Sequence, residues 1–389
     1  MRYLKLKKII LLIFIYPISF CIIRDKKSIV VGSYNNGFSD NSKYYYLWLL
    51  QNRNGLKVTW ITGCDKTYKT MRALNLPVLK RWSIAGFIAT LRAGTYIYSA
   101  YLRDINFYTS GRAKRVNLWH GVGIKEIDFS ITSGPLKKQF NTSLFNLSRI
   151  LFPDIFARPN LVLAPSLEMA KHFSKSFRID QNHCHLNGMP RTSLHKVQMK
   201  TNEEENYLIS GCVASHKWVY LPTWRDNKNS LPNDLLGNLK IIDKNLENRD
   251  THLFIKLHPN EKINQVGSFN NITFIEPKFD IYPHLPEFDG LITDYSSVLY
   301  DFLSVGCDKI ILHLYDFANY RSNSRNLIYD FEESVVGEIT YKIDDFINAL
   351  LLSKTVDIYK KRLVQERFIQ YNECDFDKLT DAVLGLTYE

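Results

Sequence analysis

Cysteine is scarce in this chain, and none of it is arranged in pairs. The sequence contains six cysteines and no Cys-x-x-Cys motif. They are Cys21, Cys64, Cys184, Cys212, Cys307 and Cys374, and most of them lie within apolar stretches, as small core residues do. This usage argues against a disulfide framework and a cysteine metal site, and it is typical of a reducing cytoplasm.

The sequence also lacks the signatures of nucleic-acid binding. It has no zinc-finger spacing, no helix-turn-helix pattern and no basic run with interleaved aromatics. It is nevertheless basic, with 50 Lys and Arg against 39 Asp and Glu and a formal net charge of +11. Such a balance attracts polyanions. An anionic membrane surface or a phosphorylated substrate fits the sequence better than nucleic acid, which we do not expect as a partner.

No low-complexity tract interrupts the chain, which is 45% hydrophobic and 13% aromatic. That composition argues against disorder, and 389 residues are too many for one ordinary core. Predicted strands and helices alternate along most of the sequence. We therefore expect an α/β protein with two Rossmann-like domains facing a central cleft.

The N-terminal apolar run is too short to cross a membrane. Residues 9–23 form an uncharged stretch of 15 residues that Pro17 interrupts, whereas a span needs ~20. Ser19-Phe20-Cys21 is a poor signal-peptide cleavage site. Cations flank the run on both sides: Arg2, Lys5, Lys7, Lys8, Arg24, Lys26 and Lys27. We expect residues 1–27 to associate with an anionic inner leaflet; the alternative is a buried first strand or helix.

Hydrophobic periodicity predicts the order of elements. Strands are expected at 28–32, 57–62, 95–99, 115–119, 161–164, 183–186, 217–221, 253–257, 272–275, 290–293 and 309–314. Helices are expected from residue 39 or 40 to about 53 and at 83–92, 167–177, 234–248, 344–353 and 356–371.

Two stretches do not fit this alternation. Residues 134–158 have the pattern of a basic amphipathic helix, which suits a membrane surface or, equally, an ordinary helix covering the sheet. Residues 201–216 are acidic at their start and form the predicted interdomain linker. The predicted organisation is thus a membrane-associating segment 1–27, domains at 28–205 and 206–375, and a tail at 376–389.

The stretch 289–303 carries the clearest local signal. A predicted strand ends at Asp294, and Ser296 and Ser297 open an amphipathic helix. A serine-capped helix start aims backbone N–H groups and the positive end of the helix dipole at one point, which favours an anion. Taken alone, the pattern equally fits the ordinary N-cap of a buried helix.

Polar residues follow other predicted strands as well. His120, Arg225 and His258 each come after a strand, and open α/β sheets bind ligands beyond the carboxyl ends of their strands. With Arg191 and Lys256, they supply positioning, positive charge and a base. These are the requirements of phosphoryl transfer.

Signatures of metal-assisted phosphate chemistry are absent. The chain has no P-loop, and its Asp-x-Asp sequence at 375–377 lies away from any predicted strand end. We therefore expect neither a metal nor a cofactor.

In their order and spacing, these motifs resemble the CDP-glycerol glycerophosphotransferase family, which includes teichoic-acid glycerol-phosphate primases and polymerases. The matching stretches are LWHGVGIK at 118–125, NGMPR at 187–191, LPTWRD at 221–226, KLHP at 256–259, ITDYSS at 292–297 with Asp301-Phe302, and YDF at 329–331 before Gly337. One departure is Val122-Gly123, where many members have Thr-Pro. It leaves the acceptor specificity open.

The resemblance implies a GT-B-like fold and an enzyme at the cytoplasmic face of the cell membrane. The enzyme would transfer glycerol phosphate from CDP-glycerol, or ribitol phosphate from CDP-ribitol, to a hydroxyl of a lipid-linked glycan acceptor, releasing CMP. The product would be a teichoic acid or a capsular polysaccharide. The first domain would face the acceptor and the membrane, and the second would bind the CDP-alditol.

The resemblance also implies roles for particular residues. His120 would be the base on the acceptor hydroxyl, and His258 would hold the donor pyrophosphate. The predicted substrate-binding residues are Gly121, Arg191, Pro222, Thr223, Arg225, Lys256, Asp294, Ser296, Ser297 and Asp301. Two alternatives stay open: a GT-B glycosyltransferase that uses a nucleotide sugar, and an inactive membrane-bound nucleotide-binding module.

Overall fold

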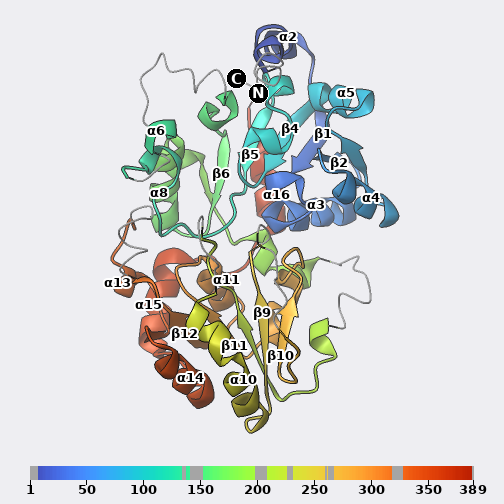
Figure 1. Cartoon of the computed structure of the whole chain (residues 1–389). Helices are drawn as coiled ribbons and strands as arrows, with labels where there is room; N and C mark the ends of the chain where they lie inside the picture. The colour runs from blue at the N-terminus through green and yellow to red at the C-terminus, as the bar shows by residue number, and fades with distance from the viewer. Residues whose placement is uncertain are drawn as a thin grey trace. The chain divides into compact units, whose positions relative to one another are not determined.

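In the computed structural model of the protein, residues 8–133, 137–140, 152–197, 208–225, 231–258, 261, 267–317 and 327–387 are described. The chain forms two compact units. Unit 1 comprises residues 1–120, 126–200 and 370–389, and unit 2 comprises residues 121–125 and 201–369. Each unit is built on a parallel sheet with helices packed against it, which confirms the predicted α/β class (Figure 1).

The described residues of unit 1 carry a seven-stranded sheet in the order β3-β2-β1-β4-β5-β6-β7, with neighbouring strands parallel. The strands are β1 (Asp25–Gly32), β2 (Lys57–Thr62), β3 (Val78–Lys80), β4 (Ala93–Tyr98), β5 (Lys114–Asn117), β6 (Leu161–Ala164) and β7 (Cys184–Leu186). The strand order reverses between β1 and β4. Such a switch point, at the carboxyl ends of the strands, is where these sheets bind ligands.

The helices of unit 1 cover strands whose side chains are buried on both faces. Ile29, Val30 and Val31 of β1 are fully buried, so the strand has no polar alternation. The helices are α2 (Tyr16–Cys21), α3 (Asp40–Asn52), α4 (Asp65–Ala73), α5 (Ile84–Arg92), α6 (Lys137–Phe140), α8 (Leu167–Phe177) and α16 (Phe376–Gly385). The Ser83 and Ser166 hydroxyls accept hydrogen bonds from the first turns of α5 and α8, as expected of N-caps.

The N-terminal segment is docked on unit 1 by one face. A π-helical turn (Leu11–Ile15) leads into α2, where Pro17 lies in the first turn and needs no N–H partner. Tyr16 stacks on Phe107 with ring centroids 4.6 Å apart. Arg24 donates to the carbonyl oxygens of Ser19, Thr90, Ala93, Thr109 and Gly111, so this predicted membrane-flanking cation serves inside the unit instead.

The opposite face of the same segment is apolar and exposed. Ile13, Phe14 and Ile18 are 57%, 60% and 51% exposed. Over the described residues, no helix has both the length and the apolarity to cross a bilayer. The first strand begins at Asp25 rather than at the predicted residue 28, because Asp25 already pairs with Ala93 of β4.

The C-terminus is not the separate tail that the sequence predicts. Residues 376–385 form α16, and Phe376, Leu379 and Val383 are buried in the core of unit 1 with Trp48 of α3. The Trp48 and Phe376 rings stack with centroids 5.2 Å apart. The predicted boundary at 375 is therefore wrong. The helix carries too much apolar surface to be left in water, and it completes the core of the first unit.

The described residues of unit 2 carry a six-stranded parallel sheet in the order β10-β9-β8-β11-β12-β13. The strands are β8 (His216–Tyr220), β9 (Thr251–Lys256), β10 (Ile272–Ile275), β11 (Gly290–Thr293), β12 (Lys309–His313) and β13 (Glu338–Thr340). The helices are α10 (Asn233–Glu247), α11 (Val298–Ser304), α13 (Phe331–Ser334), α14 (Ile343–Leu352) and α15 (Ile358–Phe368). Here the order reverses between β8 and β11.

Most predicted elements are present, and several have their predicted bounds, including β2, β6, β10, β11 and α8. The sequence analysis did not predict β3, α4 or β13. Residues 134–136 and 141–151 of the predicted amphipathic helix and 201–207 of the predicted linker lie outside the described residues.

Candidate active site

His120 lies at the carboxyl edge of the sheet of unit 1, three residues after β5 ends. Its ring is exposed, and its Nδ1 is 2.9 Å from the carbonyl oxygen of Ser99, which directly follows β4. The preceding Trp119 has φ of +49°, in the left-handed region that a tryptophan rarely adopts. Its N–H donates to Asn117 Oδ1 at 2.9 Å, which helps to hold this turn. Such strained residues cluster at functional sites.

The Ser99 contact determines which ring nitrogen of His120 is basic. A carbonyl oxygen can only accept, so Nδ1 carries the proton in this hydrogen bond. The neutral ring then has its lone pair on Nε2. Ser99 is itself held across the switch point, because its hydroxyl is 2.6 Å from that of Ser42 on α3. The fold thus presents His120 in the tautomer that a general base requires.

Arg191 holds the loop that carries His120. Only 3% of its side chain is exposed, and its Nη1 donates to the His120 carbonyl oxygen at 2.8 Å and to Asp40 Oδ1 at 2.9 Å. Next to Asp40, Asn41 Oδ1 accepts from the Arg191 N–H, and Asn41 Nδ2 donates to the carbonyl oxygens of Leu118 and Trp119. Arg191 therefore belongs to unit 1, whereas the other predicted substrate-binding residues belong to unit 2.

The rest of the 187–191 motif anchors the C-terminal segment to unit 1. Asn187 Nδ2 donates to the Asp375 carbonyl oxygen, and Asn187 Oδ1 accepts from the Asp375 N–H, both at 2.8 Å. A Cβ on Gly188 would lie 2.2 Å from the Glu373 backbone, so only glycine allows this approach. The motif is explained by packing and by its support of His120.

At the switch point of unit 2, Asp294 joins the ends of β8 and β11. Its carboxylate is fully buried and accepts from the Thr223 N–H at 3.0 and 3.1 Å, from the Thr223 hydroxyl, and from the Tyr295 N–H at 2.6 Å. Arg225 Nη2 donates to its other oxygen at 2.9 Å. Thr223, Arg225 and Asp294 were all predicted as site residues, and the structure brings them together.

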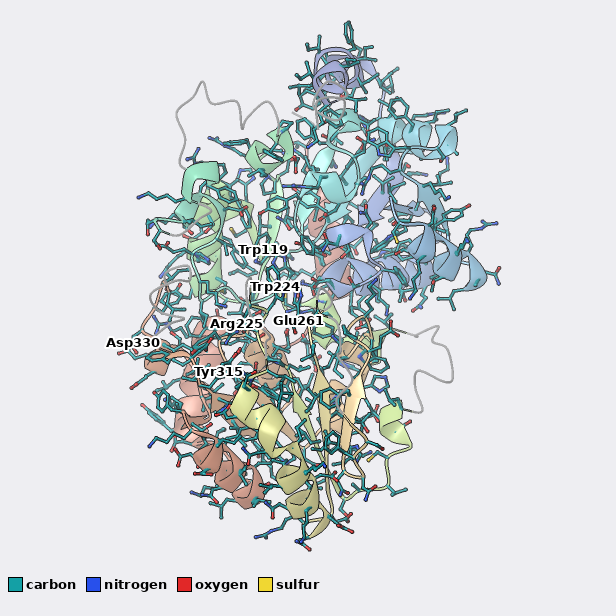
Figure 2. The ribbon with its side chains drawn as sticks, in the orientation of Figure 1. Trp119, Trp224, Arg225, Glu261, Tyr315 and Asp330 are labelled. Atoms are coloured by element: carbon teal, nitrogen blue, oxygen red, sulfur yellow. The ribbon has the colours of Figure 1, made fainter. Side chains whose placement is uncertain are left out.

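A second carboxylate completes this arrangement. Arg225 donates from Nε to Asp316 Oδ2 at 2.9 Å and from Nη2 to Asp316 Oδ1 at 3.1 Å, while its guanidinium lies 5.6 Å from the ring centre of Tyr315 (Figure 2). Burial lowers the pKa of Arg225, but the hydrogen bonds of Asp316 and the charge of Asp294 outweigh it, so the pKa is raised. Arg225 is a permanent cation whose charge these two carboxylates compensate.

His258 and Lys256 lie at the carboxyl end of the neighbouring strand β9. The His258 ring stacks on Trp224 with centroids 5.7 Å apart. Burial and then the charge of Lys256 lower the pKa of His258, so the ring is neutral at pH 7. Burial lowers the pKa of Lys256 to about 8, against the opposing charge of Asp280. Among the described residues, no ion pair engages Lys256, in contrast to Arg225.

The remaining predicted residues occupy varied places. Ser296 and Ser297 are half-buried before α11, and Ser296 Oγ accepts from the Val298 N–H at 3.3 Å, whereas Ser297 makes no capping hydrogen bond. Asp301 is on α11 itself, with Tyr282 OH at 3.4 Å from its Oδ2. Pro222 and Gly121 are buried, and Gly121 has φ of +134°, which suits glycine.

Several residues that build these edges were not predicted as site residues. They are Asp40, Asn41 and Ser99 in unit 1, and Trp224, Tyr295, Tyr315 and Asp316 in unit 2. Asp316 follows a predicted strand, so the strand-end criterion applied to His120 and Arg225 would have found it, whereas Ser99 was predicted as the last residue of a strand. Asp40 and Asn41 had only a helix-capping signal.

The chain resembles known proteins over most of its length. Residues 14–384 match the family described as CDP-Glycerol:Poly(glycerophosphate) glycerophosphotransferase. It is 25% identical over 351 residues to a teichoic acid glycerol-phosphate transferase of Staphylococcus aureus, covering 86% of this chain and 85% of that protein. It is 27% identical over 364 residues to a teichoic acid poly(glycerol phosphate) polymerase of Bacillus spizizenii, covering 88% and 89%.

A solved structure supports the fold. The wall teichoic acid polymerase TagF superposes with a TM-score of 0.73 at 19% identity, covering 92% of this chain and 89% of that one. At that identity the likeness concerns the GT-B-like fold alone, and the family match concerns the activity. The protein therefore belongs to the CDP-glycerol:poly(glycerophosphate) glycerophosphotransferase family and is an enzyme of that type.

Proposed function

We propose that the protein transfers glycerol phosphate or ribitol phosphate from the corresponding CDP-alditol to a hydroxyl of a lipid-linked glycan acceptor. The acceptor oxygen attacks the phosphorus that bears the alditol, the bond to the bridging oxygen of the pyrophosphate breaks, and CMP leaves. The acceptor hydroxyl loses its proton to a base. The product belongs to a teichoic acid or a capsular polysaccharide.

The observation that carries the proposal is the hydrogen bond from His120 Nδ1 to Ser99 O, at 2.9 Å. It leaves Nε2 as the acceptor for the hydroxyl proton, on an exposed ring at the ligand-binding edge of the sheet. Arg191 and Asp40 are positioning residues in this proposal, because they act on the His120 backbone rather than on substrate.

Unit 2 supplies the groups proposed to bind the donor. Lys256 is the cation we assign to the phosphates, because Arg225 is already engaged by Asp294 and Asp316. His258, stacked on Trp224, is proposed to hydrogen-bond the pyrophosphate and to assist departure of CMP. Phosphoryl transfer needs such positioning and charge neutralisation more than covalent help from the protein.

We also propose that the enzyme works at the cytoplasmic face of the cell membrane, as a peripheral or monotopic protein. The support is the exposed apolar face of the N-terminal segment, with Ile13, Phe14 and Ile18 each more than half exposed. The net charge of +11 favours an anionic surface. A lipid-linked acceptor would be presented at such a surface.

The test is a donor and acceptor panel with the purified full chain. CDP-glycerol and CDP-ribitol are incubated separately with lipid-linked acceptors, CMP is quantified, and products are measured by mass spectrometry. We expect the mass of the acceptor to increase by one alditol phosphate for each CMP released. Turnover of a CMP- or UDP-sugar with no turnover of either CDP-alditol would overturn the proposal in favour of a glycosyltransferase. Absence of any CMP release would favour an inactive binding module.

A further inference from the structure

A cavity lies in unit 1 at the amino-terminal edge of the sheet, opposite the edge that carries His120. Its volume is about 180 Å³, room for about six waters at ~30 Å³ each. It lies where β5 begins and β6 is about to begin. The lining residues are Tyr16, Phe20, Ser110, Gly111, Arg112, Ala113, Lys114, Arg115, Asn160 and Thr387.

The lining is strongly cationic. Arg112, Lys114 and Arg115 all contribute to it, and no lining residue is acidic. Lys114 is 7% exposed and its Nζ donates to the Leu384 carbonyl oxygen at 3.0 Å. Arg115 Nε donates to Asn160 Oδ1 at 3.3 Å. Neither arginine forms an ion pair with any carboxylate of the described residues.

Three cations around one small cavity repel each other unless an anion joins them. Burial and then the charge of Lys26, which lies outside the lining, lower the pKa of Lys114. The bond to Leu384 accounts for Lys114 as a structural residue. It does not account for the two arginines, whose planar donors suit phosphate oxygens.

One wall of the cavity belongs to the N-terminal segment. Tyr16 and Phe20 of α2 line it, and the Gly111 N–H donates to Ser19 Oγ of the same helix at 3.0 Å. Ile13, Phe14 and Ile18 of this segment are more than half exposed. The segment thus has an exposed apolar face and also forms one wall of a cationic cavity, as expected of a surface that meets the acyl boundary and the headgroups of a membrane.

We propose that this cavity binds the phosphate of an anionic membrane lipid while the exposed face of the N-terminal segment enters the acyl boundary. The inference rests on the membrane association in the proposed function, and it assigns that association a specific headgroup site. Arg112 and Arg115 contact the phosphate oxygens, and Tyr16 and Phe20 flank the glycerol backbone of the lipid.

The test compares Arg112→Gln/Arg115→Gln with a control that removes the same charge from α8, Lys171→Gln/Lys175→Gln. Each full-length variant is floated with phosphatidylcholine vesicles with or without phosphatidylglycerol. We expect the arginine variant to bind phosphatidylglycerol vesicles about 25-fold more weakly, the loss for two interfacial cations. The control is expected to bind like the wild type. Equal binding by both variants would overturn the site.

Two further measurements separate the possible failures. Inorganic phosphate is titrated into lipid-free wild type and the arginine variant; phosphate binding lost in the variant with unchanged vesicle binding would make this a free-phosphate site and overturn the lipid assignment. CMP release from CDP-glycerol and from CDP-ribitol, each with a lipid-linked acceptor in detergent, is measured in parallel. Normal release with no vesicle binding by the wild type overturns the membrane inference alone, whereas no release at all overturns the proposed transfer reaction.

Discussion

The carboxyl edges of the two sheets are built by different physical means. In unit 1, His120 is positioned by backbone groups: its ring donates to the Ser99 carbonyl oxygen, and its own carbonyl oxygen accepts from Arg191. In unit 2, the corresponding edge is held by full charges, with Arg225 between the carboxylates of Asp294 and Asp316.

The difference indicates that the carboxyl edges of the two sheets have different roles. The Ser99 carbonyl oxygen fixes the tautomer of the His120 ring and leaves Nε2 as the proton acceptor. Arg225 lies between two carboxylates and joins two strand ends, so we propose that it contributes rigidity and leaves the phosphates to Lys256. We therefore propose that unit 1 supplies the base and that unit 2 supplies a rigid frame for Lys256 and His258, the residues assigned to the donor.

The largest expected effect tests whether Arg225, between Asp294 and Asp316, stabilises unit 2. Arg225→Ala leaves Asp294 buried beside Asp316 without a compensating cation, so the free energy of unfolding of unit 2 should fall by ~3–5 kcal/mol. Urea unfolding with hydrogen exchange of the β8 and β11 amides measures it. The matched control is Arg53→Ala, whose ion pair with Asp377 is exposed and should contribute at most ~1 kcal/mol. If Arg225→Ala lowers the free energy of unfolding no more than Arg53→Ala does, Arg225 does not hold the two strand ends together.

The next effect tests the base. His120→Ala should lower turnover by at least ~100-fold while leaving the KM for the CDP-alditol nearly unchanged, because a general base acts on the acceptor in the transition state. Steady-state kinetics of CMP release measures both. His183 offers the control: it also makes an Nδ1 contact to a backbone carbonyl, that of Asn160, but it lies before β7 at the opposite edge. Similar losses for the two alanine variants would remove His120 from its role.

A third prediction concerns the donor side. His258→Ala should lower turnover by at least ~100-fold, because the pyrophosphate loses a hydrogen-bonding group where charge develops. His252 on the same strand is the comparison, since its Nε2 contacts Thr273 Oγ1 at 2.8 Å, inside the sheet and away from the strand end. The same CMP assay decides. Near-normal turnover in the His258 variant would mean that Trp224 and Lys256 hold the donor without it.

The fold itself could be predicted well from the sequence, because the apolar strands have no polar alternation and are bounded by turn residues. The prediction was wrong at the C-terminus, where α16 returns to the core of unit 1. Periodicity along the chain shows that 376–385 has a buried face, but it cannot show which sheet that face covers.

The sequence identified many residues of the candidate site but not the contacts that each of them makes. Strand-end residues were found by position, so Thr223, Arg225 and Asp294 were named together. That Arg225 and Arg191 are each engaged by carboxylates could not be predicted, since Asp316 and Asp40 are distant from them in sequence. A cationic residue in a sequence motif gives the same pattern whether its side chain binds phosphate or stabilises a loop.

A smaller effect follows from Lys256. Its pKa of about 8 means that the ammonium loses its proton as the pH rises through that value, so kcat/KM for the CDP-alditol should fall ~10-fold for each pH unit above it. Lys256→Arg stays protonated and should extend activity to higher pH, whatever its effect at pH 7. pH profiles of both proteins test this. Identical alkaline limbs would assign the loss to another group.

The smallest effect distinguishes two adjacent serines that the sequence treats alike. Only Ser296 Oγ accepts from a backbone N–H at the start of α11, so Ser296→Ala should lower the free energy of unfolding by ~0.5–1 kcal/mol. Ser297→Ala should change it by less than ~0.5 kcal/mol. Denaturant unfolding without ligand compares them under the same conditions. If Ser297 has the larger effect instead, its hydroxyl and not that of Ser296 caps α11. The hydroxyl left to contact a phosphate would then be that of Ser296, whereas the hydrogen bond between Ser296 and Val298 leaves that of Ser297.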